Sequence, residues 1–214
     1  MSIFDHANGG VPMRFEITKA DKQELCRRAP EFEPAVKRFD VRPFESDGDL
    51  FCALAQSIVS QQLAVRAAEA IFTRVAALPG GVTPEGILGA PEEKLRACGL
   101  SARKVEYLRA AARAGASGEL DFSSLAAKSD AEVIDALVKL KGVGVWTAEM
   151  LLIFSLCRRD VLSYRDLGIR RGVMRLYGVP EPTEAEFEYY RRRYSPCGTL
   201  ASLYLWKIKD EGRI

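Results

Sequence analysis

The chain has 214 residues, of which 48% are hydrophobic and 28% charged, and its formal net charge is +2 at pH 7. This length allows one large or two small domains, and the hydrophobic fraction is ample for a buried core, which excludes a disordered chain. No stretch approaches the roughly 18 apolar residues of a membrane span, and no basic start precedes an apolar run, so we expect a cytoplasmic protein.

Residues that bind metals are sparse. The only histidine, His6, has no second ligand nearby, so we expect no histidine chemistry. The cysteines form no C-x-x-C pair, which predicts reduced thiols, no disulfides and no zinc or other metal site. The five cysteines are Cys26, Cys52, Cys98, Cys157 and Cys197.

The N-terminal segment is predicted to be an arm followed by a short helix. Residues 1–15 show no hydrophobic periodicity. A helix over Thr18–Ala29 is expected next, capped by Thr18 and ended by Pro30.

Two glutamines interrupt the first strongly apolar region. The spacing of apolar residues predicts one helix from about residue 46 or 47 to 59 and another from about 63 to 75. Gln61 and Gln62 lie at the break. On residue type alone, they are the polar cap of an interhelix loop.

A longer helix over residues 101–114, capped by Ser101, follows two short helices that carry proline in the first turn. Its apolar positions face inward, whereas Arg103, Lys104 and Arg109 do not. We interpret these cations as solvated surface, with electrostatic attraction of a polyanion as the alternative.

A helix, a tight turn and a second helix are predicted between residues 130 and 154. The first helix begins at a capping box on Ser129, and the second begins near Val145. Gly142 and Gly144 lie between them, allow positive φ and lack a Cβ, so backbone N–H groups there can face an anion. An ordinary helical hairpin is the alternative. The candidate anion-binding residues are Gly142, Val143, Gly144 and Thr147.

Three helices are predicted in the last third, over residues 167–176, 184–194 and 199–209. No segment of the chain shows sustained alternation with a period of two, so the fold class is all-α. Arginines crowd this third, including the run Arg191–Arg193, which indicates either a polyanion partner or a solvated charged face.

Several segments, in this order, resemble the helix-hairpin-helix DNA glycosylase superfamily, most closely its 3-methyladenine DNA glycosylase II (alkylation-repair) branch. They are Ile58–Leu63, Gly99–Lys104, Leu140–Phe154, Asp166–Gly172 and, more loosely, Leu200–Trp206. The resemblance implies two helical subdomains with a cleft between them and the hairpin at its mouth. Residues 1–44 would pack with the C-terminal subdomain, 45–145 would form the central one, and 146–214 would carry the catalytic residue.

The resemblance makes Asp166 the catalytic carboxylate. Release of a nucleobase leaves positive charge on the sugar, which a carboxylate stabilises while it orients water. From residue type alone, the favoured interpretation of Asp166 is the N-cap of the next helix.

Other roles follow from the same resemblance. Gln62, with Gln61 beside it, would fill the gap left by a flipped nucleotide. Trp146 stands where strand-cutting branches carry a Schiff-base lysine, which implies a monofunctional enzyme, although Lys141 leaves weak lyase activity open. The base pocket would consist of Trp146, Met150 and Trp206.

Three departures from the family pattern put substrate range in doubt. They are Ser163-Tyr164-Arg165 before the aspartate, Lys141 in the hairpin, and Pro196–Thr199, where relatives carry an aromatic residue and an arginine.

We expect no iron–sulfur cluster, because only Cys197 lies near the C-terminus, and a monovalent cation at the hairpin carbonyls is an option. The expected partner of this monomeric, nucleoid-associated enzyme is duplex DNA with alkylated purines. The alternatives are a glycosylase for other damaged or mismatched bases, a non-catalytic DNA-binding module and a small-molecule enzyme.

Overall fold

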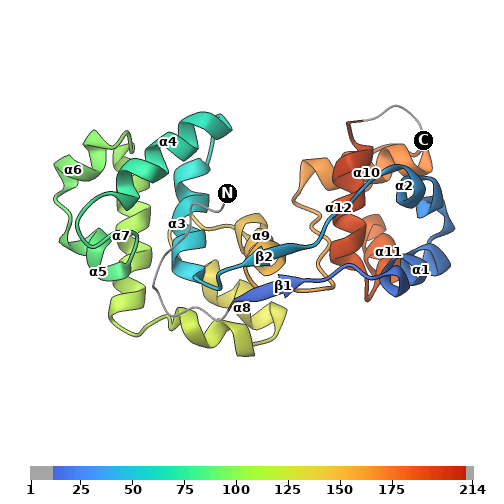
Figure 1. The fold of residues 1–214 in the computed structure, drawn as a ribbon, viewed down its shortest axis with the longest axis horizontal. Coiled ribbons are helices and arrows are strands. Elements are labelled where there is room, and N and C mark those ends of the chain that lie inside the picture. Colours follow the sequence, from blue (N-terminus) through green and yellow to red (C-terminus); the bar gives the residue numbers. More distant parts are fainter. Residues whose placement is uncertain (1–11, 211–214) are drawn as a thin grey trace. The chain divides into compact units, whose positions relative to one another are not determined.

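The computed structural model describes residues 12–210, so the predictions for His6 and most of the N-terminal arm lie outside the described residues. Two compact units make up this part of the chain. We call residues 47–151 the hairpin unit, and residues 12–46 with 152–210 the aspartate unit. Helices dominate both, as the all-α class predicts (Figure 1). The predicted cleft stays a prediction.

Long helices carry the core of the hairpin unit. α7 packs against α3 and α5, and Leu54, Ile58 and Leu108 are among the side chains that this packing buries. The elements of this unit are α3 (Leu50–Ser60), α4 (Val65–Ala76), α5 (Pro84–Gly89), α6 (Glu92–Ala97), α7 (Ala102–Ala116), the 3₁₀-helix η2 (Phe122–Ala127), α8 (Asp130–Leu137) and the first residues of α9 (Val145–Phe154), which continues into the other unit.

Two helix boundaries differ from the prediction. α3 begins at Leu50 because the Asp49 side chain accepts a hydrogen bond from the backbone N–H of Cys52 at 2.9 Å, which places the N-cap two residues later than expected. α8 ends at Leu137, three residues early. Its predicted capping box on Ser129 is confirmed.

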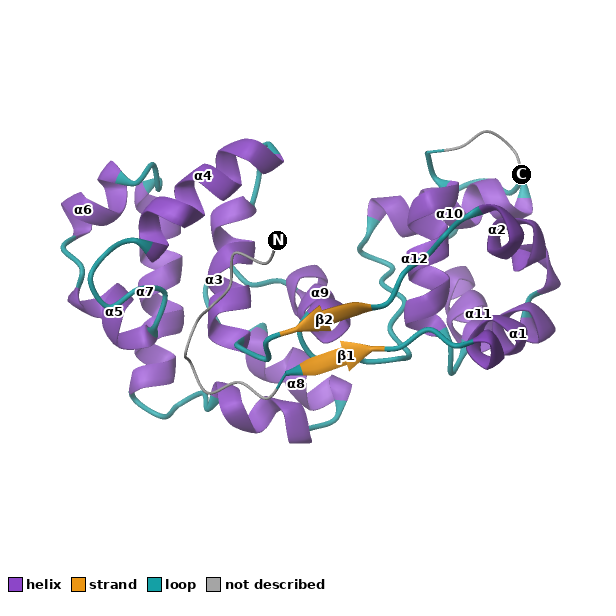
Figure 2. Cartoon of the chain, in the orientation of Figure 1, coloured by secondary structure: helices purple, strands orange, loops and turns teal. Residues whose placement is uncertain are grey.

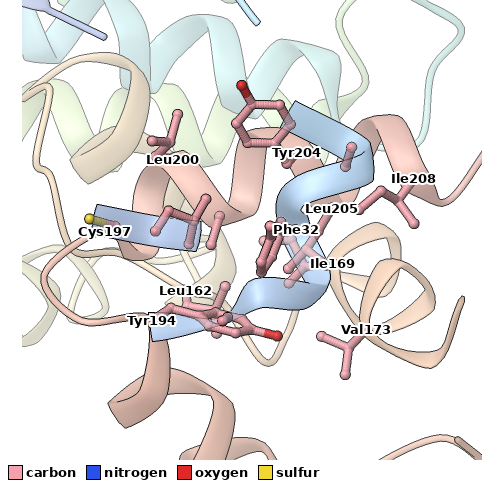
Figure 3. Packing of buried hydrophobic residues seen from close by; sticks show 14 of the residues in the cluster. Phe32, Leu162, Ile169, Val173, Tyr194, Cys197, Leu200, Tyr204, Leu205 and Ile208 are labelled. Carbon is pink, nitrogen blue, oxygen red and sulfur yellow. The ribbon is translucent and has the colours of Figure 1, made fainter. Parts of the chain in front are cut away.

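The aspartate unit surrounds one large hydrophobic cluster. α10 packs along α12, and Figure 3 shows Ile169 and Val173 of α10 beside Leu205 and Ile208 of α12. The predicted caps on Thr18 and Thr183 are confirmed. The helices of this unit are α1 (Lys19–Arg28), the 3₁₀-helix η1 (Pro30–Phe32), α2 (Glu33–Arg38), α10 (Leu167–Tyr177), α11 (Glu184–Tyr194) and α12 (Gly198–Ile208).

A short antiparallel sheet joins the two N-terminal segments of the aspartate unit (Figure 2). β1 (Met13–Phe15) pairs with β2 (Phe44–Ser46), Met13 opposite Ser46. The predicted arm is therefore wrong for residues 13–15. Strands of three residues are too short to show alternation in sequence.

None of the helices in residues 12–210 combines the length and the hydrophobicity that crossing a bilayer would require.

Candidate functional site

The two glutamines form a strained turn at the end of α3. The Leu63 N–H donates to the Ser60 carbonyl at 3.2 Å, and Gln61 has φ −50° and ψ 127°. Gln62 has φ 58°, so the turn resembles type II, which favours glycine or asparagine at that position. The strain is on the order of 1 kcal/mol or more. Gln62 is exposed, which suits a side chain that enters the duplex.

Gln61 connects this turn to the hairpin. Its Nε2 donates to the Gly142 carbonyl oxygen at 3.0 Å, although the two residues lie 81 positions apart. The structure thus separates the roles of the two glutamines. Gln61 is tied down by the hairpin, and Gln62 points outward beside it.

Gly142 is the glycine that the hairpin requires. Its φ is +85°, and a Cβ built on it would overlap the ring of Tyr107. Gly144 does not have a positive φ, and a Cβ there would meet nothing within 4 Å, so of the two glycines only Gly142 uses the conformational freedom that glycine allows. The open backbone at Gly144, directly before the N-terminus of α9, is where an anion can approach.

Two other residues of the predicted anion site lie in the interior. The N–H of Val143 already donates to the Leu140 carbonyl at 3.1 Å, and Val143 is buried. Thr147 is 3% exposed. Phosphate contact by these two residues stays a prediction; turn closure uses the Val143 amide, and core packing encloses Thr147.

α9 leaves one stripe of its surface uncovered. Most of the helix is buried, including its two polar residues, Thr147 and Glu149. Trp146 is 42% exposed, Phe154 is 44% exposed, and Met150 between them is partly buried. Residues four apart share a helix face, so these three form a continuous row. The predicted pocket residues Trp146 and Met150 belong to this row, and Phe154 was missed.

Lys141 is held by a carboxylate. Its Nζ lies 2.6 Å from Glu106 Oε1, and this hydrogen bond and charge raise the pKa of the Lys141 ammonium. A protonated amine cannot attack an aldehyde, so the contact disfavours imine formation at this lysine.

Asp166 has two roles at once. Its Oδ1 accepts from the backbone N–H of Ile169 at 2.8 Å, as a helix N-cap does, and from Trp206 Nε1 at 2.9 Å. Asp166 is 9% exposed. The structure therefore brings Asp166 and Trp206 together, which spacing in the sequence did not show.

Gly168 permits this contact. A Cβ at Gly168 would lie 2.9 Å from Trp206 Cδ1 and 3.0 Å from Asp166 Oδ1. Any larger residue would push the indole away from the carboxylate. Gly168 is a second residue of the site that the sequence analysis missed.

An aromatic row continues from Trp206. Phe154 stacks on Trp206 with ring centroids 5.7 Å apart and planes at 20°. Phe44 of β2 packs on Phe154 at 5.5 Å, and Phe15 of β1 stacks on Phe44 at 5.1 Å. The sheet thus supports an aromatic surface that ends at the Asp166 carboxylate. Its signal in sequence was weak, because isolated phenylalanines are more often core residues.

The departures from the family pattern have structural roles. Tyr164 packs on Phe187 at 5.4 Å, and its carbonyl accepts from Arg170 at 2.6 Å. The Gly198 N–H donates to Asp160 Oδ1 at 2.9 Å. These contacts fix the loop before Asp166 and the start of α12, the helix that carries Trp206.

Much of the C-terminal arginine cluster is engaged within the chain. Arg193 Nη2 lies 2.7 Å from Glu31 Oε2, and Arg191 Nη1 lies 2.8 Å from Glu188. For these two arginines the structure favours an internal role over a polyanion contact.

Three cations of α7 differ in their surroundings. Arg103 is exposed, but Lys104 and Arg109 are partly buried and donate to backbone carbonyls, so the solvated-surface interpretation is wrong for both.

Comparisons with known proteins identify the family. The model of the HhH-GPD superfamily base excision DNA repair proteins matches residues 55–197. The chain is 42% identical to DNA-3-methyladenine glycosylase 1 of Schizosaccharomyces pombe over 159 residues, which cover 72% of this chain and 70% of that protein.

Two solved structures are similar throughout. The DNA-3-methyladenine glycosidase of Bacillus halodurans has a TM-score of 0.79 at 35% identity, covering 94% of this chain and 96% of that one. A Schizosaccharomyces pombe 3-methyladenine DNA glycosylase in complex with abasic DNA has a TM-score of 0.76 at 35% identity, covering 92% and 99%. The chain belongs to the HhH-GPD superfamily of base excision DNA repair proteins.

Proposed function

We propose that the chain is a monofunctional DNA glycosylase that hydrolyses the N-glycosidic bond of alkylated purines of the 3-methyladenine type in duplex DNA. The observation that carries the proposal is the contact of Asp166 with Trp206, on which the exposed ring of Phe154 stacks. It places a carboxylate beside electron-rich rings. The similar proteins described above are DNA-3-methyladenine glycosylases, which supports the same activity.

Each unit supplies part of the reaction. Asp166 stabilises the positive charge that develops on the deoxyribose and orients water for attack. In the aspartate unit, Trp206 and Phe154 offer ring faces to a base that alkylation has made cationic, a cation–π contact of about 0.5–2 kcal/mol, and Trp146 stays a predicted pocket residue. Alkylation also weakens the glycosidic bond, so modest catalysis is enough.

The hairpin unit holds the duplex. The open backbone at Gly144 and the N-terminus of α9 face a phosphate, where the helix dipole favours negative charge. Gln62 occupies the gap that the flipped nucleotide leaves, and its amide can hydrogen-bond the unpaired base.

Neither Trp146 nor Lys141 supplies an amine for cutting the strand. Trp146 cannot form an imine, and Glu106 holds the Lys141 ammonium. We propose a product that is an intact strand with an abasic site.

We propose that the partner is double-stranded DNA and that the protein acts on it as a monomer at the nucleoid.

A monovalent cation at the hairpin is compatible with the residues present. The Leu140 and Gly142 carbonyls each accept one hydrogen bond and keep a second lone pair for a ligand. When bound, such a cation would add positive charge for a phosphate. Catalysis without any other cofactor stays a prediction.

The test is mass-spectrometric identification of the bases released from alkylated genomic DNA. We expect the parent protein to release 3-methyladenine and 7-methylguanine, and Asp166→Asn, prepared identically to control for contaminating host glycosylases, to release both at least about a hundredfold more slowly. Release of uracil or oxidised bases alone would favour a glycosylase of another specificity. Tight, salt-dependent binding to abasic duplex without release of any base would favour a non-catalytic DNA-binding module.

A further inference from the structure

Lys104 is placed unusually for a lysine near the start of a helix. Its Nζ donates to the Val59 carbonyl at 2.7 Å and to the Gln61 carbonyl at 2.8 Å. It is partly buried, and burial lowers the pKa of its ammonium. Both acceptors belong to the end of α3, where unpaired carbonyls and the helix dipole favour a cation.

The second acceptor determines the conformation of the glutamine turn. The Gln61 carbonyl belongs to the central peptide of the turn from Ser60 to Leu63. Types I and II differ by a flip of this peptide, and only type II gives the third residue a positive φ. The third residue is Gln62, with φ 58°. A donor fixed on the Gln61 carbonyl therefore opposes the flip that would return Gln62 to a relaxed, negative φ.

We propose that Lys104 is a positioning residue, which holds the Gln61–Gln62 peptide in the flipped orientation and so aims Gln62 into the duplex. This inference rests on the proposed function. In this proposal Lys104 does not contact DNA, and it affects the rate of base release only through the position of Gln62.

The rest of the first turns of α7 supports the same arrangement. Tyr107 packs against Gly142, and Glu106 pairs with Lys141. Gln61 then links its own turn to the Gly142 carbonyl. The first turns of α7 thus contact both the turn that enters the duplex and the hairpin that meets the phosphate.

The experiment compares Lys104→Met with Lys94→Met. The first variant keeps the aliphatic stem and removes the donors, and the second removes an exposed lysine of α6 as a matched control of charge. Single-turnover release of 3-methyladenine is measured on a fully paired duplex and on one with an abasic site opposite the lesion. We expect Lys104→Met to lose about tenfold on the paired duplex, where opening costs most, and less than about twofold on the other. Lys94→Met should match the parent.

A double variant tests whether Lys104 acts through Gln62. If Lys104 acts through Gln62, then Lys104→Met combined with Gln62→Ala should be no slower than Gln62→Ala alone. Multiplying losses would overturn the proposal. Equal losses on both duplexes, with a shallower salt dependence of binding, would instead indicate a phosphate contact by Lys104.

Thermal unfolding of each variant serves as the control for changes in stability. Should Lys104→Met not fold, Lys104→Leu, which also removes the donors, is judged by the same criteria. A parent without activity on any alkylated duplex would refute the proposed function itself. An active parent whose Lys104→Met variant equals Lys94→Met refutes only the role of Lys104.

Discussion

The two units hold their key residues in different ways. In the aspartate unit, Asp166 is fixed first by a local cap, the N–H of Ile169 three residues later, and then by Trp206. In the hairpin unit, Gln61 is held by Lys104, 43 positions away, and bonds to Gly142, 81 positions away. A helix cap is a self-contained device, whereas a strained turn persists only while its surroundings enforce it. Substitutions at Asp166 in the aspartate unit should therefore change the rate of base release and the stability separately. Substitutions around the glutamine turn in the hairpin unit should change both together.

The largest expected effect comes from separating the two roles of Asp166. Asn caps a helix as well as Asp but carries no charge, so Asp166→Asn should fold like the parent and lose about 10²–10⁴-fold in base release. Asp166→Ala should show a similar fold loss in the rate of base release and, in addition, lose about 1 kcal/mol of unfolding free energy. Single-turnover kinetics and urea unfolding measure the two effects. An Asn variant with the parent's rate would exclude Asp166 as the catalytic carboxylate.

Gly142→Ala should be the most destabilising change in the hairpin unit. Its Cβ combines a φ of +85° with overlap of the Tyr107 ring, for a cost of about 2–4 kcal/mol. Gly144→Ala is the matched control, because nothing lies within 4 Å of a Cβ there. We expect it to retain stability and weaken binding to abasic duplex. Equal stability of the two variants in urea unfolding would contradict the assignment of strain to Gly142.

Gly168→Ala should slow catalysis about tenfold without a matching loss of stability, since Ala is well tolerated in a helix. The added Cβ would displace Trp206 from Asp166. Gly89→Ala, at the end of α5 with no atom within 4 Å of the new Cβ, serves as control. Rates of 3-methyladenine release are measured alongside unfolding. Parent-like rates for Gly168→Ala would mean that the Trp206 contact does not matter for the reaction.

The smallest effects concern two core tyrosines of the aspartate unit (Figure 3). The buried hydroxyl of Tyr204 has no hydrogen-bond partner within residues 12–210, and burial raises its pKa to about 12. Tyr204→Phe should therefore be neutral or stabilising by up to about 1 kcal/mol. Tyr194 bonds the Tyr177 hydroxyl at 3.1 Å, so Tyr194→Phe should cost about 1 kcal/mol. Urea unfolding that ranks the variants in the opposite order would refute this account.

Local signals in the sequence predicted most of the helices. The caps on Thr18, Ser129 and Thr183 are correct because a side-chain cap is complete within four residues. The resemblance to alkylation-repair glycosylases is confirmed by the comparisons. The short sheet escaped prediction because strands of three residues are stabilised by their partner rather than by their own pattern.

Within the site, the sequence pointed to Asp166, Gln62 and Trp146 through the family resemblance, and by itself it determined the helix cap at Asp166. Only the tertiary structure decided that Gln61 is tied to Gly142, that Trp206 donates to Asp166, and that Lys104 is no surface lysine. The reason is physical. Helix caps are satisfied by neighbours in the chain, whereas a side chain that donates to an oxygen atom some 40 to 80 positions away finds it only after the helices pack.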